Sequence, residues 1–129
     1  MKTFFLLLSM AMAPAAFSQD WKNFEEAKNL AAKENKNIIL VFSGSDWCAP
    51  CIKLDKSIWQ SEDFKSEAKK EWILVKADFP KKKGHELPAA LQEQNKSLAE
   101  KYNKDGFFPL VVVLDKNGKA IGKTGFKNV

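Results

Sequence analysis

The sequence contains no arginine, and all 21 of its basic residues are lysines. The forked guanidinium of arginine supplies many of the contacts by which proteins recognise base edges and phosphates. The formal net charge of +5 therefore does not indicate nucleic-acid recognition, and no nucleic-acid partner is predicted. The short basic run Lys81-Lys82-Lys83 is most simply a solvated loop, with a docking patch for an acidic partner as the alternative.

The sequence also lacks an apolar run of the ~20 residues that a membrane-spanning helix needs. Its N-terminal apolar stretch, residues 4–13, follows Met1-Lys2 and precedes small residues at Ala16 and Ser18. This pattern is typical of a secretory signal peptide. Residues 1–18 are predicted to be that signal, and residues 19–129 to form one domain with no stable membrane insertion after cleavage. A membrane anchor or a buried N-terminal helix is the alternative.

Cysteine is equally scarce, with only Cys48 and Cys51 in the whole chain. In an exported protein, two cysteines often form a structural disulfide. Such a crosslink stabilises most when it closes a long loop, because it then removes more entropy from the unfolded chain. A bridge across two intervening residues closes almost no loop. The spacing therefore favours an exchangeable, functional disulfide.

The surroundings of the two cysteines support a redox role. An apolar strand-like run, residues 38–42, leads into Trp47-Cys48-Ala49-Pro50-Cys51, and a helix-like segment, residues 52–56, follows. A Cys-x-x-Cys pair at a strand-to-helix junction is a redox signature. Backbone N–H groups at the start of a helix stabilise a thiolate on the first cysteine. We expect Cys48 to be the exposed nucleophile and Cys51 the more buried partner.

The order of the predicted elements indicates an α/β domain. Apolar spacing predicts a first helix that starts near Trp21 with Asp20 as its cap, and a later helix with Pro88 in its first turn. Strands are predicted at 38–42, 72–78, 110–114 and 119–124, with further helices after Cys51 and after Ser61, the first of which weakens near Ser57. Right-handed crossovers imply parallel pairing in the first part, and the final hairpin must be antiparallel. The prediction is one mixed sheet with helices on its faces.

The chain carries two motifs that go together: Trp47-Cys48-Ala49-Pro50-Cys51 after a core strand, and Gly106-Phe107-Phe108-Pro109 before residues 110–114. With them the chain resembles the thioredoxin superfamily. Three further segments, Asp78-Phe79-Pro80, Leu87-Pro88 and residues 94–102, resemble exported thioredoxin-like proteins of Gram-negative bacteria, some of which are disulfide reductases or isomerases. The resemblance implies a thioredoxin-like fold, with its last helix absent or truncated because the sequence ends at Val129. It also implies a cis bond between Phe108 and Pro109.

The resemblance further implies a function. The expected activity is reduction of protein disulfides in the periplasm, with electrons from a membrane donor and without a cofactor or metal. The expected catalytic residues are Cys48 and Cys51. The residues expected to contact the substrate are Trp47, Ala49, Pro50, Phe108 and Pro109.

The chain departs from the family in two places. Thioredoxins keep a buried aspartate on the strand before the motif, where this chain has Val41 and Phe42. Lys76 matches the lysine that pairs with that aspartate, so its partner is missing, and water or Asp46 is left as a base for Cys51. Asp46 also fits a turn residue. No histidine stands between the cysteines, which favours reduction over oxidation.

Three alternatives remain open at this stage. The same exchange chemistry is compatible with an isomerase or an oxidant, since direction depends on the reduction potential and the redox partner. The cysteines are also compatible with half of a zinc site, for which His85 is the further candidate ligand. Finally, the chain is compatible with a binding module on a thioredoxin scaffold, because a fold does not determine a function.

Overall fold

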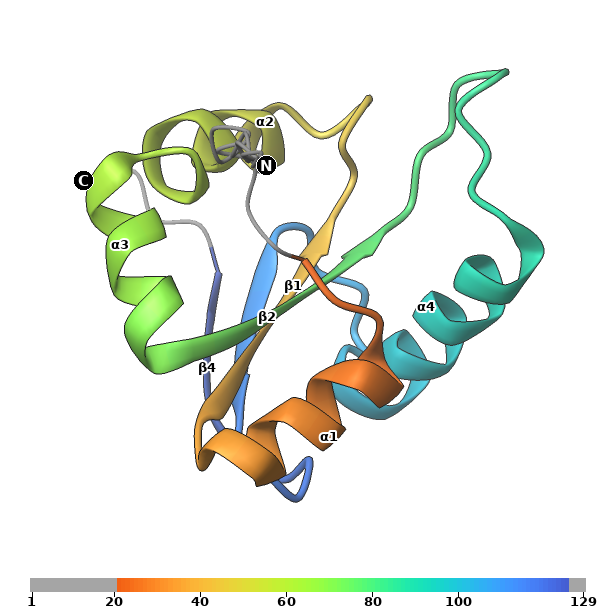
Figure 1. Cartoon of the computed structure of the whole chain (residues 1–129). Helices are drawn as coiled ribbons and strands as arrows, with labels where there is room; N and C mark the ends of the chain where they lie inside the picture. Colours follow the sequence, from red (N-terminus) through yellow and green to blue (C-terminus); the bar gives the residue numbers. More distant parts are fainter. Residues whose placement is uncertain (1–20, 126–129) are drawn as a thin grey trace, which may run out of the picture.

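The computed structural model describes residues 21–125, so the predicted signal peptide and the predicted cap Asp20 lie outside the described residues. Within the described range the chain forms nine elements, and Figure 1 shows how they are arranged. They are α1 (Phe24–Glu34), β1 (Asn37–Ser43), α2 (Ala49–Leu54), the π-helical turn η1 (Asp55–Trp59), α3 (Glu62–Glu71), β2 (Trp72–Asp78), α4 (Ala89–Tyr102), β3 (Leu110–Leu114) and β4 (Ala120–Gly125).

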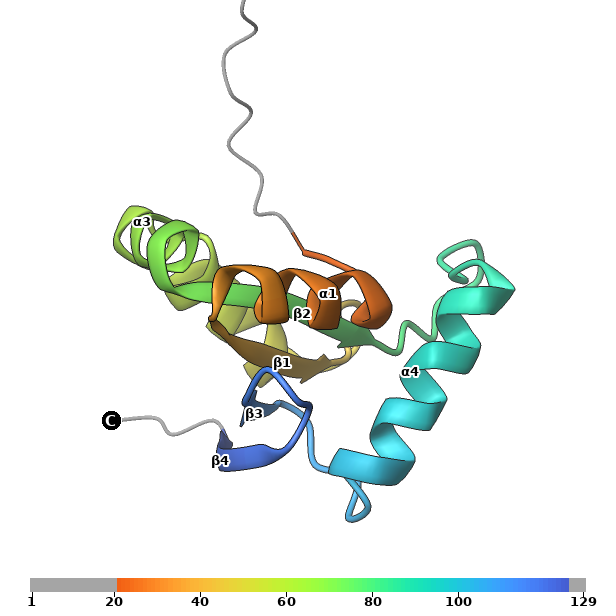
Figure 2. The same ribbon diagram turned by 60° about the horizontal axis from the view of Figure 1, so that its bottom comes forward.

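The four strands form one mixed sheet in the order β2-β1-β3-β4. β1 pairs with β2 in parallel and with β3 antiparallel, and β3 and β4 form an antiparallel hairpin. In Figure 2 this hairpin forms one edge of the sheet, beyond β1. The predicted mixed sheet and the thioredoxin-like architecture are confirmed.

Helices cover both faces of the sheet because successive side chains of a strand point to opposite faces. On one face, Ala27 and Ala31 of α1 and Leu98 of α4 pack against Leu40 and its neighbours. On the other face, residues of η1 and α3 pack against Ile39 and Val41. Figure 1 shows this separation, with α2 and α3 on one side of the sheet and α4 on the other. Central strand β1 is accordingly buried at all but its first residue, and it is apolar from Ile38 to Phe42.

Helix α1 begins later than the sequence pattern predicts. Its cap is Asn23, whose side chain accepts a hydrogen bond from the Glu26 N–H at 2.8 Å, and the helix starts at Phe24. Trp21 instead forms a bridge with Leu74 of β2, and the next residue donates its N–H to the Leu74 carbonyl at 2.8 Å. The prediction of a helix that includes Trp21 is therefore wrong. The pairing with β2 holds the backbone extended there.

The segment after the cysteines divides as predicted. The expected weak point near Ser57 corresponds to η1, where the helix widens to a π-helical turn, and α3 starts after Ser61, which caps it through the Phe64 N–H. Pro88 differs slightly from its prediction. It lies immediately before α4, at the cap position, and the first helical residue is Ala89.

Candidate functional site

The candidate site lies at one end of the strands, where β1 and β2 finish and β3 begins. Phe42, near the end of β1, pairs with Ala77 of β2 on one side and with Leu110 of β3 on the other. This pairing therefore brings three segments together at the same end of the sheet: the turn after β1, the loop after β2 and the Phe108–Pro109 segment before β3. Helix α2, which begins directly after Cys48, starts there as well.

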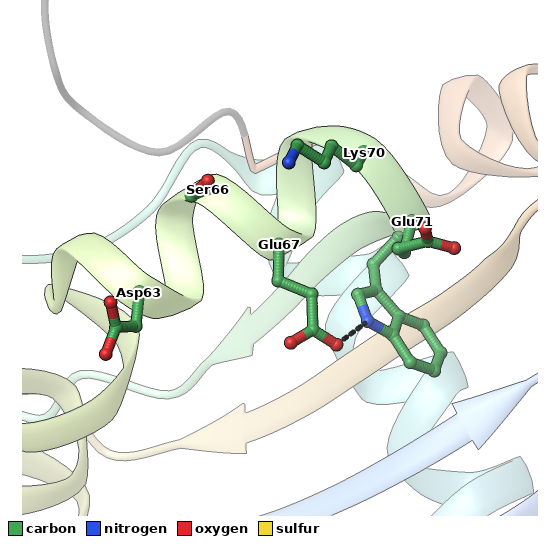
Figure 3. Close-up of a pocket in the computed structure, with 6 residues that line it drawn as sticks. Asp63, Ser66, Glu67, Lys70 and Glu71 are labelled. Atoms are coloured by element: carbon green, nitrogen blue, oxygen red, sulfur yellow. Dashed lines mark hydrogen bonds between the residues drawn. The ribbon is translucent and has the colours of Figure 1, made fainter.

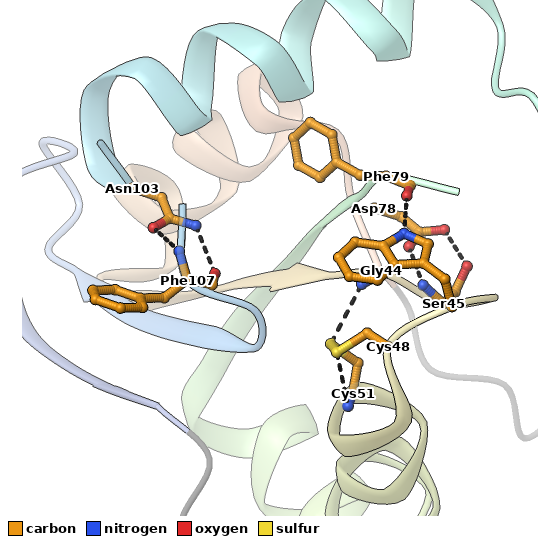
Figure 4. The surroundings of a disulfide bond; sticks show 9 residues. Gly44, Ser45, Cys48, Cys51, Asp78, Phe79, Asn103 and Phe107 are labelled. Atoms are coloured by element: carbon orange, nitrogen blue, oxygen red, sulfur yellow. Dashed lines mark hydrogen bonds between the residues drawn. A yellow bond between two sulfur atoms is a disulfide. The ribbon is translucent and has the colours of Figure 1, made fainter. Parts of the chain in front are cut away.

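Cys48 and Cys51 are joined by a disulfide, with their Cα atoms 5.2 Å apart. Cys48 is the N-cap of α2, and its Sγ accepts the Cys51 N–H at 3.3 Å. The Gly44 N–H points at Cys51 Sγ at 3.4 Å (Figure 4). Each sulfur therefore faces a backbone N–H donor. This arrangement suits a thiolate, because donors at a helix start stabilise negative charge.

The expectation that Cys48 is exposed is wrong for this disulfide form. The exposed fractions are 5% for Cys48 and 3% for Cys51, so the two are almost equally buried. The chain folds back before the helix, with the Cys48 N–H bonded to the Gly44 carbonyl at 2.9 Å, and the disulfide holds both sulfurs beneath this turn. The neighbouring Ala49 and Pro50 are exposed.

Two of the predicted contact residues, Trp47 and Phe108, meet in an aromatic cluster beside the disulfide. Their ring centroids are 5.4 Å apart, and Phe79 lies 5.5 Å from Phe108, both pairs edge to face. The Trp47 indole N–H donates to the Phe79 carbonyl at 2.7 Å. Gly44 makes room for this indole, since a Cβ there would overlap its ring. Pro109 is buried, and the bond that precedes it is cis.

Sequence reasoning missed how the segment before Pro109 is held. Buried Asn103 donates from Nδ2 to the Phe107 carbonyl at 2.9 Å and accepts the Phe107 N–H with Oδ1 at 3.0 Å (Figure 4). The Phe107 side chain is displayed to solvent, with 60% of its surface exposed. The Asn103-Lys104-Asp105-Gly106 run signals a turn, but not which backbone groups the asparagine binds.

Asp46 proves to be a structural residue. Its carboxylate accepts the backbone N–H groups of Lys81 at 2.9 Å and Lys82 at 3.0 Å, and lies 2.7 Å from Nδ1 of His85. The Lys81 N–H above all, with help from His85 and Lys82, lowers the pKa of Asp46 to about 2. A carboxylate this acidic is a poor proton acceptor. Asp46 therefore ties the cysteine turn to the loop after β2, and the turn interpretation is confirmed.

Lys76 has a carboxylate partner other than the strand aspartate that this chain lacks. Its Nζ lies 3.7 Å from Asp55 of η1 and 4.5 Å from the centroid of the Trp21 ring. The partner comes from the helical segment after the cysteines, and no strand aspartate is needed to balance the charge. Matching to the family could not find this pair, because Asp55 does not stand at the position of the family's strand aspartate.

Other parts of the described chain offer weaker candidates. Figure 3 shows a depression along α3, lined by Glu67 and other polar residues, where the Trp72 indole donates to Glu67. It lies at the start of β2, the end of the sheet opposite the disulfide. Within residues 21–125, no three His, Cys, Asp or Glu side chains are grouped to hold a metal ion. None of the helices in this range has the length and apolar character to cross a bilayer.

The chain is similar to known proteins over most of its length. The model of a thioredoxin-like family matches residues 20–116. Disulfide bond reductase DsbH of Chlamydia pneumoniae is 37% identical over 113 residues, which are 88% of this chain and 66% of that protein. Thioredoxin-related protein DsbJ of the same organism is 26% identical over 129 residues, 95% of this chain and 36% of that protein.

A solved structure extends this similarity to the fold. The structure of DsbH oxidoreductase is 35% identical to this chain and superposes with a TM-score of 0.79, covering 93% of this chain and 82% of that one. The chain spans less than two thirds of the length of either Chlamydia protein. The family match and the likeness to DsbH in sequence and structure show that the chain belongs to the thioredoxin-like family.

Proposed function

We propose that the protein is a thiol–disulfide oxidoreductase that reduces protein disulfides in the bacterial cell envelope. The observation that carries this proposal is the Cys48–Cys51 disulfide at the start of a helix, with a backbone N–H directed at each sulfur. The name of the similar DsbH protein, a disulfide bond reductase, supports the direction. So does the absence of a histidine between the cysteines, since that residue makes such a disulfide a stronger oxidant.

In the proposed reaction, the reduced protein attacks a substrate disulfide with the thiolate of Cys48. The substrate S–S bond breaks, Cys48 becomes disulfide-bonded to one substrate sulfur, and the departing sulfur takes up a proton. Cys51 then attacks Cys48 Sγ as a thiolate, and the second substrate thiol leaves. The substrate gains two electrons and two protons, and the protein is left with its Cys48–Cys51 disulfide. A dithiol donor must reduce this disulfide before the next turnover.

The surface around the disulfide suits an extended substrate segment. Trp47, Ala49 and Pro50 are exposed next to the sulfurs. We assign the backbone of Phe108, just before the cis bond to Pro109, to pairing with that segment. The Phe108 ring packs against Trp47, so this backbone lies at the same end of the sheet as the disulfide. Apolar rings beside a few polar backbone groups are the usual composition of a binding surface.

We place the mature protein in the periplasm, after removal of a signal peptide of residues 1–18. The basic start, the short apolar stretch and the small residues at Ala16 and Ser18 support this placement. A reductase in an oxidising compartment needs a supply of electrons, so its partner on the donor side is proposed to be a membrane protein that hands over a dithiol pair.

The proposal is tested with matched cysteine variants and a reduction potential. Cys48→Ser is expected to abolish disulfide reduction, and Cys51→Ser to accumulate a mixed disulfide that gel electrophoresis without reductant detects. Equilibration of the wild type in dithiothreitol buffers is expected to give a potential near about −270 mV. Activity that survives in Cys48→Ser contradicts the assigned nucleophile. A potential near about −120 to −180 mV contradicts the reductase direction.

A further inference from the structure

The loop after β2, residues 79–86, is bound to the turn that carries the cysteines, and we call it the lysine loop. Asp46 binds two of its backbone N–H groups and the ring of His85. Trp47 donates to the Phe79 carbonyl, and the Phe79 N–H donates to Ser43 at 2.9 Å. These five contacts fix the position of the loop relative to the disulfide. None of them uses a lysine ammonium group.

The ammonium groups of Lys81, Lys82 and Lys83 are therefore left at the surface. All three residues are exposed, and within residues 21–125 none of them forms an ion pair. Lys81 Nζ lies 4.0 Å from the centroid of the Trp47 ring, so one positive charge sits directly on the residue before Cys48. The bound backbone of the loop therefore holds exposed positive charge at a fixed place beside the disulfide.

The acidic groups close to this loop are occupied by backbone donors or side chains. The Asp46 side chain is only 9% exposed, and its carboxylate is bonded to the backbone of Lys81 and Lys82 and to His85. Glu86 accepts the Gly84 N–H at 3.1 Å, and Asp78 accepts both the N–H and the hydroxyl of Ser45. Their hydrogen bonds lie within the lysine loop or join it and the end of β2 to the cysteine turn. The three lysines thus present the positive charge of this surface outward.

We infer that the lysine loop binds an acidic segment of the protein substrate, next to the substrate's reactive cysteine. This inference rests on the proposed function and names the class of substrate. The partner is a protein segment because the charge lies over Trp47, beside the sulfur that the partner's cysteine must reach. Opposite charges near the reacting atoms raise the rate of productive encounter, and the effect weakens as salt screens it over a Debye length of about 10 Å at 0.1 M.

The test measures kcat/KM for three disulfide-linked peptides whose residues flanking the cysteine are acidic, neutral or basic. The test variant is Lys81→Gln/Lys82→Gln/Lys83→Gln. The control, Lys33→Gln/Lys69→Gln/Lys116→Gln, removes the same charge from the end of the sheet where β1 and β2 start. Exposed ion pairs are individually weak, and three together correspond to about a tenfold rate difference at low salt. Circular dichroism checks that both variants are folded.

The expected result is that the wild type and the control reduce the acidic peptide about tenfold faster than the basic one. For the test variant, the rates on the acidic and the basic peptide are expected to differ by less than about twofold. Equal rates on all three peptides with the wild type overturn the inference and leave the proposed function standing. Failure to reduce any peptide overturns both. If the rates are equal, and the wild type but not the test variant sediments with anionic phospholipid vesicles, the lysine loop binds a membrane surface instead.

Discussion

Replacement of Asn103 by alanine tests whether this buried side chain positions the substrate-binding segment. Asn103 is 5% exposed and holds both the N–H and the carbonyl of Phe107, at 3.0 and 2.9 Å. Each hydrogen bond contributes about 0.5–1.5 kcal/mol net. Loss of both is therefore expected to lower the free energy of unfolding by about 1–3 kcal/mol. In a domain of this size each kcal/mol corresponds to about 4–8 °C, so we expect Tm to fall by about 10 °C.

The kinetics of Asn103→Ala show whether Asn103 positions the substrate-binding segment or only stabilises the fold. Phe107 precedes Phe108 and Pro109, the residues proposed to hold the substrate, so a loosened Phe107 is expected to raise KM more than it lowers kcat. Tm is measured by circular dichroism, and the kinetics with the neutral peptide well below Tm. Asn103→Asp is a second variant: it keeps the acceptor for the Phe107 N–H but places an acceptor oxygen against the Phe107 carbonyl, so it is expected to destabilise the segment as well. An unchanged Tm would refute the energetic reasoning, and an unchanged KM the positioning role.

Three further predictions follow from the site. Gly44→Ala places a Cβ 2.7 Å from the Trp47 Nε1 position, so the indole should move, and its Nε1–H resonance should shift in an NMR spectrum. An unshifted resonance contradicts this packing. Asp46→Asn should be less stable than the wild type at pH 7, and the difference should shrink as pH falls from the ordinary value of 3.8 towards the lowered pKa of about 2. Urea unfolding between pH 2 and 7 measures it, and a pH-independent difference opposes it. Lys76→Gln breaks a partly exposed pair with Asp55 and should cost about 1 kcal/mol or less; a larger loss in urea unfolding would show that the pair is not screened by solvent.

Much of the fold was predictable because its signals are local. The apolar run that became β1 and the apolar run of β3 need no knowledge of the rest of the chain, and the Asp115–Gly118 turn between β3 and β4 is formed by neighbouring residues. The cysteine pair was predictable for the same reason, since its function depends on residues within one helical turn. The start of α1 was not predictable, because the backbone of Trp21 is held extended by its pairing with Leu74, which lies far along the chain.

The contacts that organise the site were not predictable from the sequence. Asp46 binds backbone groups that lie 35 and 36 residues further along the chain. A turn after β1 meets the loop after β2 because the crossover between them places the two strands side by side. The spacing of apolar residues in the sequence does not show which loops meet in this way. The buried position of Cys48 has the same origin, because it follows from the fold of the turn over the disulfide rather than from the residue itself.

The missing strand aspartate can be understood from the register of the sheet. Val41 of β1 lies beside Lys76 of β2 and belongs to the apolar cluster that Trp59 and Leu74 complete. An ionised carboxylate at Val41 would have to be desolvated within that cluster, which is costly unless it is paired. This chain keeps the position apolar and supplies the countercharge for Lys76 from Asp55, where water still reaches both groups. Because Asp55 donates its N–H to the carbonyl of Cys51, the charge pair remains one helical turn from the second cysteine, without a carboxylate in the core.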